Sequence, residues 1–287
     1  MGDRLRIAAL LAPAILVIAG LFLGGLGIGA ARALGHNPVF GSDGLSLDAF
    51  RTVLGDPLFL RSLGLSLWIA GASTVIAAIL AVFAALLLRR SFAGRGIATF
   101  LFQINLTIPH LVGAIGILYL FSQSGSFARA AAGIGLIDRP AQFPALVFDP
   151  AAIGVIMAFV WKEVPFIGVV VLASLRGIGT DHEAAARTLG ARPWQVFRHV
   201  TLPMILPGLL SASAIVFAFA FGAYEVPAIL GASVPQALPV LAYRRFTDVD
   251  LAARPEAMAI ALIIALISAL ILVVYLWALR RAGGRAE

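Results

Sequence analysis

The chain has 287 residues, of which 61% are hydrophobic and 12% charged, and its mean hydropathy is +1.01. A soluble domain is typically about half apolar and a quarter charged, so this composition excludes a soluble globular protein. The net charge of +7 comes from basic residues in short clusters between apolar blocks, a pattern that indicates membrane topology and not a nucleic-acid-binding face, and the absence of cysteine excludes disulfides and thiolate sites.

The apolar residues come in blocks long enough to cross a bilayer as helices. A helix needs about 20 residues to span roughly 30 Å of hydrocarbon. The predicted spans lie near residues 7–30, 62–88, 98–121, 151–173, 206–230 and 256–279. The sequence therefore predicts an all-α membrane protein with about six transmembrane helices, and an even number of spans places both termini on the same side.

Arginine is distributed unevenly between the two sides of these spans. The side that carries both termini holds 12 arginines, and the opposite side holds eight. Because positively charged loops stay in the cytoplasm, we predict that both termini are cytoplasmic and that the chain is a multi-pass protein of the bacterial inner membrane. A cleaved signal peptide at residues 1–33 is the alternative for the first span, but its apolar stretch is longer than a signal peptide needs.

Between the first two spans, a short segment has the periodicity of a helix at the outer surface. Leu47, Phe50, Val53 and Leu54 fall at helical spacing and precede Asp56-Pro57. Punctuated segments near residues 122–150 and 231–255 form the other two external connections. We divide the chain into a first helix with its external segment (1–60), a transmembrane core (61–280) and a short cytoplasmic tail (281–287).

The longest cytoplasmic connection, near residues 177–205, predicts two short helices that meet at a glycine. Thr180 and Glu183 have the spacing of a capping box, which would start a helix that continues through alanines to Leu189. Gly190 stands where a left-handed residue would end this helix, and Pro193 stands where a second helix could begin. Such a helix-turn-helix, attached to two membrane helices, suits a mechanical coupler.

Glu183-Ala184-Ala185, Gly190 seven residues after the glutamate, and Leu202-Pro203 resemble the EAA motif of type I, binding-protein-dependent ABC importer permeases. The weaker resemblance from about residue 45 to 280 is nearest to the spermidine/putrescine, ferric-iron and phosphonate permease group. The resemblance to the EAA motif implies that the connection near residues 177–205 docks on a separate ATPase subunit. The residues assigned to this coupling surface are Glu183, Ala184, Ala185, Leu189, Gly190 and Trp194.

The resemblance also implies which partners the chain works with. They are a dimer of ABC ATPase subunits, a second permease subunit that is identical or related, membrane lipid, and a periplasmic or lipid-anchored solute-binding protein. No cofactor is expected in this chain, because ATP and Mg²⁺ would be bound by the ATPase. The sequence agrees, since a P-loop needs a lysine and the single lysine, Lys162, lies inside a predicted span.

Other enzyme chemistries lack their residues. A zinc protease helix would need a second histidine where Ala186 follows His182-Glu183, so no metal site is expected. A serine protease built on Ser211 or Ser213 has only His110 as a membrane histidine. The isolated histidines are interpreted as structural or surface residues, and we predict that the chain is not an enzyme.

Charged groups within membrane helices are costly and usually face a partner or a water-filled cavity. The candidates for a translocation pathway are Asn105, Lys162, Glu163, Tyr224 and Glu225. Glu163 could instead pair with Lys162, or either with Glu225. The two glutamates favour a cationic solute such as a polyamine, while Lys162 argues against it. An ion-coupled secondary transporter or channel is the alternative function, although it leaves the cytoplasmic helix pair unexplained.

Overall fold

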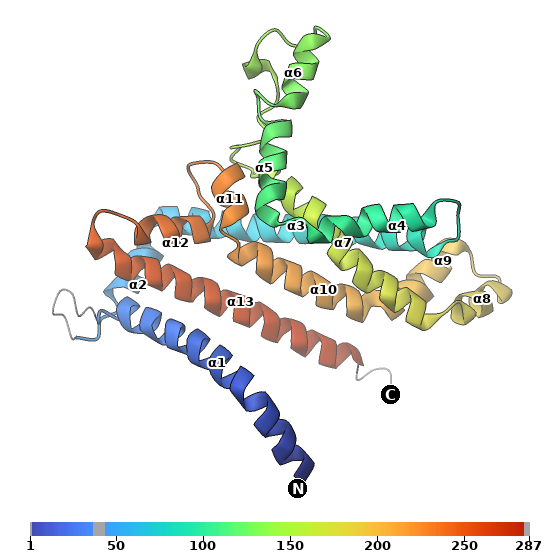
Figure 1. The fold of residues 1–287 in the computed structure, drawn as a ribbon, viewed down its shortest axis with the longest axis horizontal. Coiled ribbons are helices and arrows are strands. Elements are labelled where there is room, and N and C mark those ends of the chain that lie inside the picture. Colours follow the sequence, from blue (N-terminus) through green and yellow to red (C-terminus); the bar gives the residue numbers. More distant parts are fainter. Residues whose placement is uncertain (1, 37–43, 284–287) are drawn as a thin grey trace. The chain divides into compact units, whose positions relative to one another are not determined.

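The computed structural model describes residues 2–36 and 44–283, and every regular element within these ranges is helical (Figure 1). The first part of the chain forms α1 (Gly2–Ala33), α2 (Asp48–Gly55), α3 (Pro57–Arg89), α4 (Arg95–Ile104), η1 (Asn105–Thr107), α5 (His110–Phe121), α6 (Ser126–Gly133) and η2 (Pro140–Gln142). The second part forms α7 (Ile153–Ile178), α8 (Asp181–Thr188), α9 (Pro193–Val196), η3 (Phe197–Thr201), α10 (Leu202–Gly222), α11 (Glu225–Leu230), α12 (Leu238–Phe246), η4 (Leu251–Ala253) and α13 (Arg254–Gly283). The predicted fold class is confirmed.

Six helices of the described residues are long and apolar enough to cross a membrane. They cover Ala9–Ala33, Pro57–Arg89, His110–Gly133, Ile153–Gly177, Pro193–Gly222 and Leu251–Tyr275. Lipid offers the backbone no hydrogen-bond partners, so each span satisfies its own amides as a helix. All six overlap the predicted spans, although the third begins 12 residues after its predicted start and the fifth 13 residues before it.

The third span differs from its prediction. The sequence places one helix over residues 98–121, whereas the structure ends α4 at Ile104 and starts α5 at His110. Ile108 is extended, with φ −78° and ψ 127°, and Pro109 follows it with ψ 144°. A residue before proline avoids the helical region, so the helix breaks here, and the long apolar helix begins after the break.

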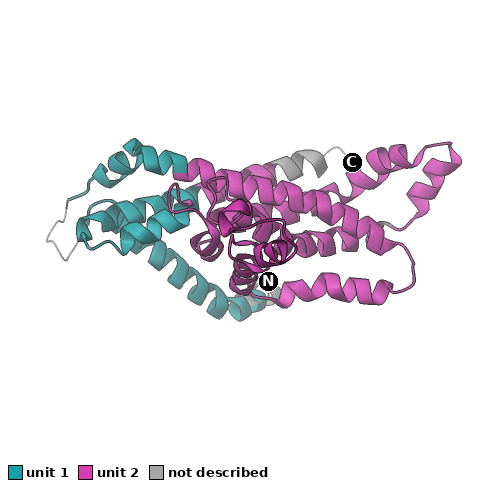
Figure 2. Cartoon of the chain, turned by 90° about the horizontal axis from the view of Figure 1, so that it is seen from above, with its two compact units in different colours: residues 1–61, 238–266 teal, residues 62–237, 267–287 magenta. Residues whose placement is uncertain are grey.

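The chain forms two compact units, coloured separately in Figure 2. Unit 1 contains residues 1–61 and 238–266, and unit 2 contains residues 62–237 and 267–287. The predicted functional division at residue 60 is a separate question and stays a prediction. The predicted amphipathic helix after the first span is present as α2, in unit 1.

Arg245 organises the polar part of unit 1. Its guanidinium donates a hydrogen bond of 2.6 Å to Asp56 and also pairs with Glu256. Asp56 in turn accepts from the backbone N–H of Leu58 at 2.8 Å, at the start of α3. One arginine thus ties α12 to the first turns of α3 and α13 within this unit.

The core of unit 2 lies where α3, α7 and α10 pack together. Small residues of α3, among them Ala77, Ala81 and Ala85, are fully buried in it beside Ile167 of α7 and Ile205 of α10. Gly208 in α10 lets this helix approach α7 closely, because a Cβ at that position would stand 2.6 Å from the Ser174 hydroxyl. These tight helix contacts fix the ends of α3, α7 and α10, from which the candidate site is built.

Candidate functional site

The connection between α7 and α10 folds as two short helices, which we call the coupling segment (residues 180–201). α8 ends at Thr188, and Gly190 then adopts the left-handed conformation, with φ +85°. The amides of Gly190 and Ala191 donate to the carbonyls of Arg187 and Ala186 at 2.9 and 3.1 Å, which closes the helix end. The predicted glycine turn is confirmed, with the helix ending one residue before Leu189.

The second helix of the coupling segment begins at Pro193, as predicted. Gln195 reaches back so that its side-chain oxygen accepts from the backbone N–H of Arg192 at 2.8 Å. After α9 the chain passes through a π-helical turn, Phe197–Thr201, and continues directly into α10. The second half of the coupling segment, α9 and η3, is therefore a continuous helical extension of α10.

Glu183 does not form the predicted capping box. Thr180 makes no side-chain hydrogen bond at the start of α8, and the carboxylate of Glu183 is turned elsewhere. Its Oε1 accepts from the Arg89 guanidinium at 2.6 Å and from the Thr201 hydroxyl at 2.7 Å. The capping prediction was wrong because the charged guanidinium of Arg89 in α3, helped by the Thr201 hydroxyl in η3, competes better for a carboxylate than a backbone amide does.

The surroundings of Glu183 keep it ionised. Burial raises the pKa of this carboxyl, but hydrogen bonds from Arg89 and Thr201 and the charges of Arg89 and Arg187 outweigh burial. The net result is a pKa below the ordinary value of 4.5. Glu183 therefore carries its negative charge throughout the physiological pH range.

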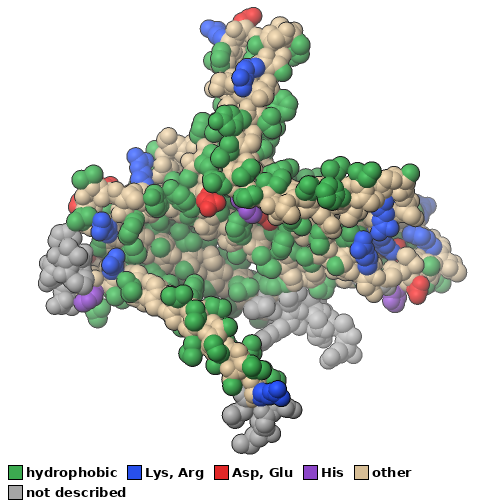
Figure 3. All heavy atoms as spheres, in the orientation of Figure 1, with side chains coloured by type: hydrophobic (Ala, Val, Ile, Leu, Met, Phe, Trp, Pro, Cys, Tyr) green, Lys and Arg blue, Asp and Glu red, His purple; other side chains and the backbone are tan. Residues whose placement is uncertain are grey.

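The other predicted coupling residues form an open surface. Leu189 is 89% exposed and Trp194 is 64% exposed, and Ala184, Ala185 and Gly190 are exposed as well. The Trp194 ring is supported by Phe197, whose centroid lies 5.5 Å away. Positively charged side chains gather around α8 and α9 in Figure 3. The segment thus offers apolar groups inside a basic border, whereas Glu183 lies beneath that surface with 12% of its side chain exposed.

A second polar group lies in the middle of the fourth span. The Lys162 ammonium is buried, and it donates to the backbone carbonyls of Asn105 and Ile108 at 2.7 and 2.5 Å. Asn105 also donates from its side chain to the carbonyl of Trp161 at 2.5 Å. Lys162 and Asn105 therefore brace the break between α4 and α5, where the helix ladder is interrupted.

Glu163, the next residue, points to a different partner. Its Oε1 lies 3.0 Å from His110 Nε2, and the His110 ring contacts Phe219 with a centroid distance of 4.7 Å. The sequence did not point to a role for His110, because its partner Glu163 lies 53 positions away along the chain. The one available signal was that His110 follows Pro109 in a membrane span.

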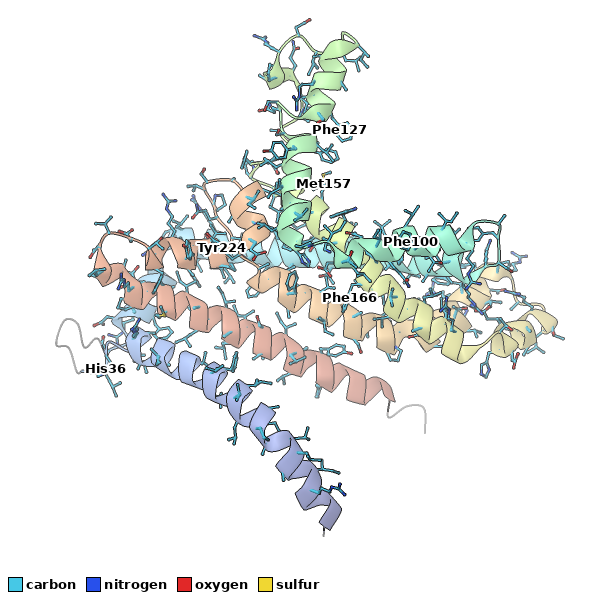
Figure 4. All side chains as sticks on the ribbon, viewed as in Figure 1. His36, Phe100, Phe127, Met157, Phe166 and Tyr224 are labelled. Atoms are coloured by element: carbon cyan, nitrogen blue, oxygen red, sulfur yellow. The ribbon has the colours of Figure 1, made fainter. Side chains whose placement is uncertain are left out.

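A pocket of about 500 Å³ opens beside His110. Its lining residues are Pro109, His110, Phe219, Ala223, Tyr224, Glu225 and Val226. Tyr224 lies at the break between α10 and α11 (Figure 4), and Glu225 is exposed. The structure thus brings His110, Tyr224 and Glu225 together around one cavity. Glu163 reaches this group through His110, while Lys162 is turned to the carbonyls of the α4–α5 break.

Comparison with known proteins identifies the family. The model of the binding-protein-dependent transport system inner membrane component matches residues 77–285. The chain belongs to this family. It is therefore a multi-pass inner membrane protein, the permease subunit of an ABC importer, and a separate subunit hydrolyses ATP. The function and family predicted from the EAA motif are confirmed.

Individual members of the family are similar over most of the permease. The molybdenum transport system permease ModB of Mycobacterium tuberculosis is 33% identical over 228 residues, which cover 77% of this chain and 80% of ModB. The putrescine permease PotI of Escherichia coli K12 is 30% identical over 223 residues, which cover 77% of this chain and 73% of PotI. A solved bacterial ABC transporter for alginate import has the same fold, with a TM-score of 0.79 at 21% identity, over 98% of this chain and 96% of that one.

Proposed function

We propose that the coupling segment is the surface through which this permease binds its ATPase subunit. The observation that carries the proposal is the exposed helix pair, turned at Gly190, whose second helix runs on into α10. Leu189 and Trp194 supply apolar contact area, and the exposed Ala184 and Ala185 permit close approach. A partner with an apolar groove and acidic rim suits this surface, and nucleotide-driven movement of that partner would be passed to the membrane helices.

The proposed orientation puts the coupling segment and both termini in the cytoplasm. Arginines cluster at the ends of α3, α4 and α7 and along the coupling segment, and positive charge is retained on the cytoplasmic side. An extracytoplasmic binding protein would then deliver solute to the opposite face. A second permease subunit, identical or related, would complete the pathway.

We propose that the pocket beside His110 forms part of the translocation pathway. Glu225 is exposed in a membrane protein, and ionisable groups in such helices mark water-filled routes. Tyr224 and Phe219 offer aromatic faces that attract cations. Lys162 and Asn105 would support the pathway from behind, because their polar groups hold the α4–α5 break.

The two relatives do not indicate which solute this chain transports. One is named for molybdenum and the other for putrescine, and they are 33% and 30% identical to this chain. The carboxylates favour a small cationic solute, of which a polyamine is the natural candidate. The unfolding temperature of the partner binding protein tests this proposal. A rise with putrescine and none with sulfate would support a cationic solute, and a rise with sulfate alone would contradict it.

The docking proposal is tested with two leucines of similar exposure. Leu189 in the coupling segment is 89% exposed, and Leu136, beyond α6, is 73% exposed. We expect Leu189→Asp to abolish co-purification of the ATPase and Leu136→Asp to leave it unchanged. Normal ATPase binding by Leu189→Asp would contradict the docking surface.

A further inference from the structure

The coupling segment is covalently attached to α7 and α10 only. α3 ends at Arg89, 94 positions before Glu183, and nothing in the chain connectivity ties α3 to the segment. Yet α3 contributes much of the core of unit 2, through Ala77, Ala81 and Ala85. This packing links α3 to α7 and α10 within the core, and a side-chain contact at the end of α3 would in addition link it directly to the coupling segment.

Arg89 supplies that contact. One guanidinium nitrogen donates to the Glu183 carboxylate at 2.6 Å, and the other donates to the Gly179 carbonyl at 3.1 Å. The same carboxylate oxygen accepts from the Thr201 hydroxyl at 2.7 Å. The resulting Arg89 cluster (Arg89, Gly179, Glu183 and Thr201) joins the end of α3, the α7–α8 turn, α8 and the last residue of η3.

This cluster differs from an ordinary surface ion pair. The Arg89 and Glu183 side chains are only 18% and 12% exposed, so water screens the pair little. Arg187, in contrast, lies 3.6 Å from Glu183 with 65% of its side chain exposed, and both residues belong to α8. Removal of Arg187 would therefore weaken a contact within one helix, whereas removal of Arg89 separates two elements and leaves a carboxylate partly buried.

We infer that Arg89 is a positioning residue that ties the inner end of α3 to the coupling segment, so that movement imposed on the segment by the ATPase reaches α3. The inference rests on the docking function proposed above. Three helices, α3, α7 and α10, then respond together, because the first is held by the Arg89 cluster and the other two by the chain itself. Glu183 acts inside the permease in this scheme, as the acceptor that joins α3 to η3.

Spin labels on the intact complex can test this route, because the chain has no natural cysteine. One label is placed at Leu87→Cys, near the inner end of α3 with 62% exposure, and a second, in separate samples, at Thr188→Cys in the coupling segment. The permease, assembled in nanodiscs with its ATPase, is measured with and without ATP and vanadate. We expect both labels to report a nucleotide-dependent change in the otherwise unaltered protein.

In Arg89→Gln, the signal at Thr188→Cys should persist while that at Leu87→Cys is lost. Loss of a hydrogen bond between charged groups shifts the equilibrium between the form with α3 tied to the coupling segment and the form without this contact by about tenfold or more, toward the latter. Arg90→Gln is the control, since Arg90 is the exposed neighbour of Arg89 in the chain. The exchanged pair Arg89→Glu with Glu183→Arg should restore part of the Leu87→Cys response.

The outcomes separate the two proposals. A full response of the Leu87→Cys label in Arg89→Gln overturns the inference, and so does an equal loss in Arg90→Gln. The Arg89→Gln complex could also fail to assemble. The inference is then overturned if the exchanged pair fails to assemble or does not restore the Leu87→Cys response. If the Thr188→Cys label is silent in the unaltered complex, or the ATPase does not bind, the docking function itself is wrong.

Discussion

Lys162 and Glu163 are neighbours in α7, yet they serve different parts of unit 2. The Lys162 ammonium bonds to two backbone carbonyls at the break between α4 and α5, whereas the Glu163 carboxylate lies 3.0 Å from His110 beside the pocket. Adjacent helical residues point about 100° apart, so they cannot share one partner easily. We therefore expect a substitution of Glu163 to affect transport and a substitution of Lys162 to affect stability.

Replacement of Glu163 should impair transport while the protein still assembles. Glu163→Gln keeps a hydrogen-bonding group near His110 but removes the carboxylate that holds this pocket residue. For a cationic solute we expect the apparent KM for uptake to rise by about tenfold, the lower range for loss of a charged contact. Uptake in vesicles, with membrane content and ATPase binding as controls, measures this. Failure of the variant to accumulate in the membrane would favour a structural pairing with His110.

Replacement of Lys162 should destabilise the permease itself. Lys162→Met preserves the length of the side chain but leaves the carbonyls of Asn105 and Ile108 without this donor. Unsatisfied buried groups cost about 1–3 kcal/mol each, so the temperature of thermal unfolding in detergent should fall. An unchanged unfolding temperature combined with altered uptake would return Lys162 to the pathway.

Substitutions at Gly190 test the turn of the coupling segment. Gly190→Val places a β-branched residue at φ +85°, which costs on the order of 1–2 kcal/mol and misdirects α9. Open space surrounds the position within this chain, so the side chain of valine meets no clash inside the permease. We expect weaker ATPase co-purification for Gly190→Val and a smaller loss for Gly190→Asn, since asparagine tolerates this conformation. If both variants co-purify the ATPase as well as the unaltered protein does, the left-handed turn at Gly190 is not needed for docking.

The proposed orientation predicts opposite labelling of two exposed sites. Leu189→Cys lies in the coupling segment and Val249→Cys, 97% exposed, lies in the connection before α13. An impermeant thiol reagent should label only Val249→Cys in intact cells and both sites after lysis. Labelling of Leu189→Cys alone in intact cells would invert the topology.

The pH dependence of the Arg89 cluster follows from the lowered pKa of Glu183. A carboxyl with a folded-state pKa below the ordinary 4.5 contributes stability that is fully present above this value and is lost as pH falls through the folded pKa. The difference in unfolding temperature between the unaltered protein and Glu183→Gln should therefore stay constant from pH 8 to about 5.5 and shrink below about 4.5. A difference that changes near neutral pH would contradict this assignment.

The sequence alone determined the six apolar spans, the glycine turn, the start of α9 and the family. These features have local causes, because a helix in lipid must satisfy its own backbone and because glycine and proline restrict φ where they stand. Pro109 lies within the third predicted span, 98–121, which was expected as one continuous helix but breaks just before this proline. Its local pattern did not show that the long helix would lie after the break instead of across it.

Only the tertiary structure decided the partners of the polar groups. Thr180 and Glu183 have capping-box spacing, yet Glu183 bonds to Arg89 and Thr201, which lie 94 and 18 positions away. His110 and Glu163 likewise meet because α5 and α7 pack side by side. A carboxylate takes the strongest donor within reach, and which donors are within reach depends on where helices cross. That crossing is set by the packing of α3, α7 and α10, which no local pattern in the chain records.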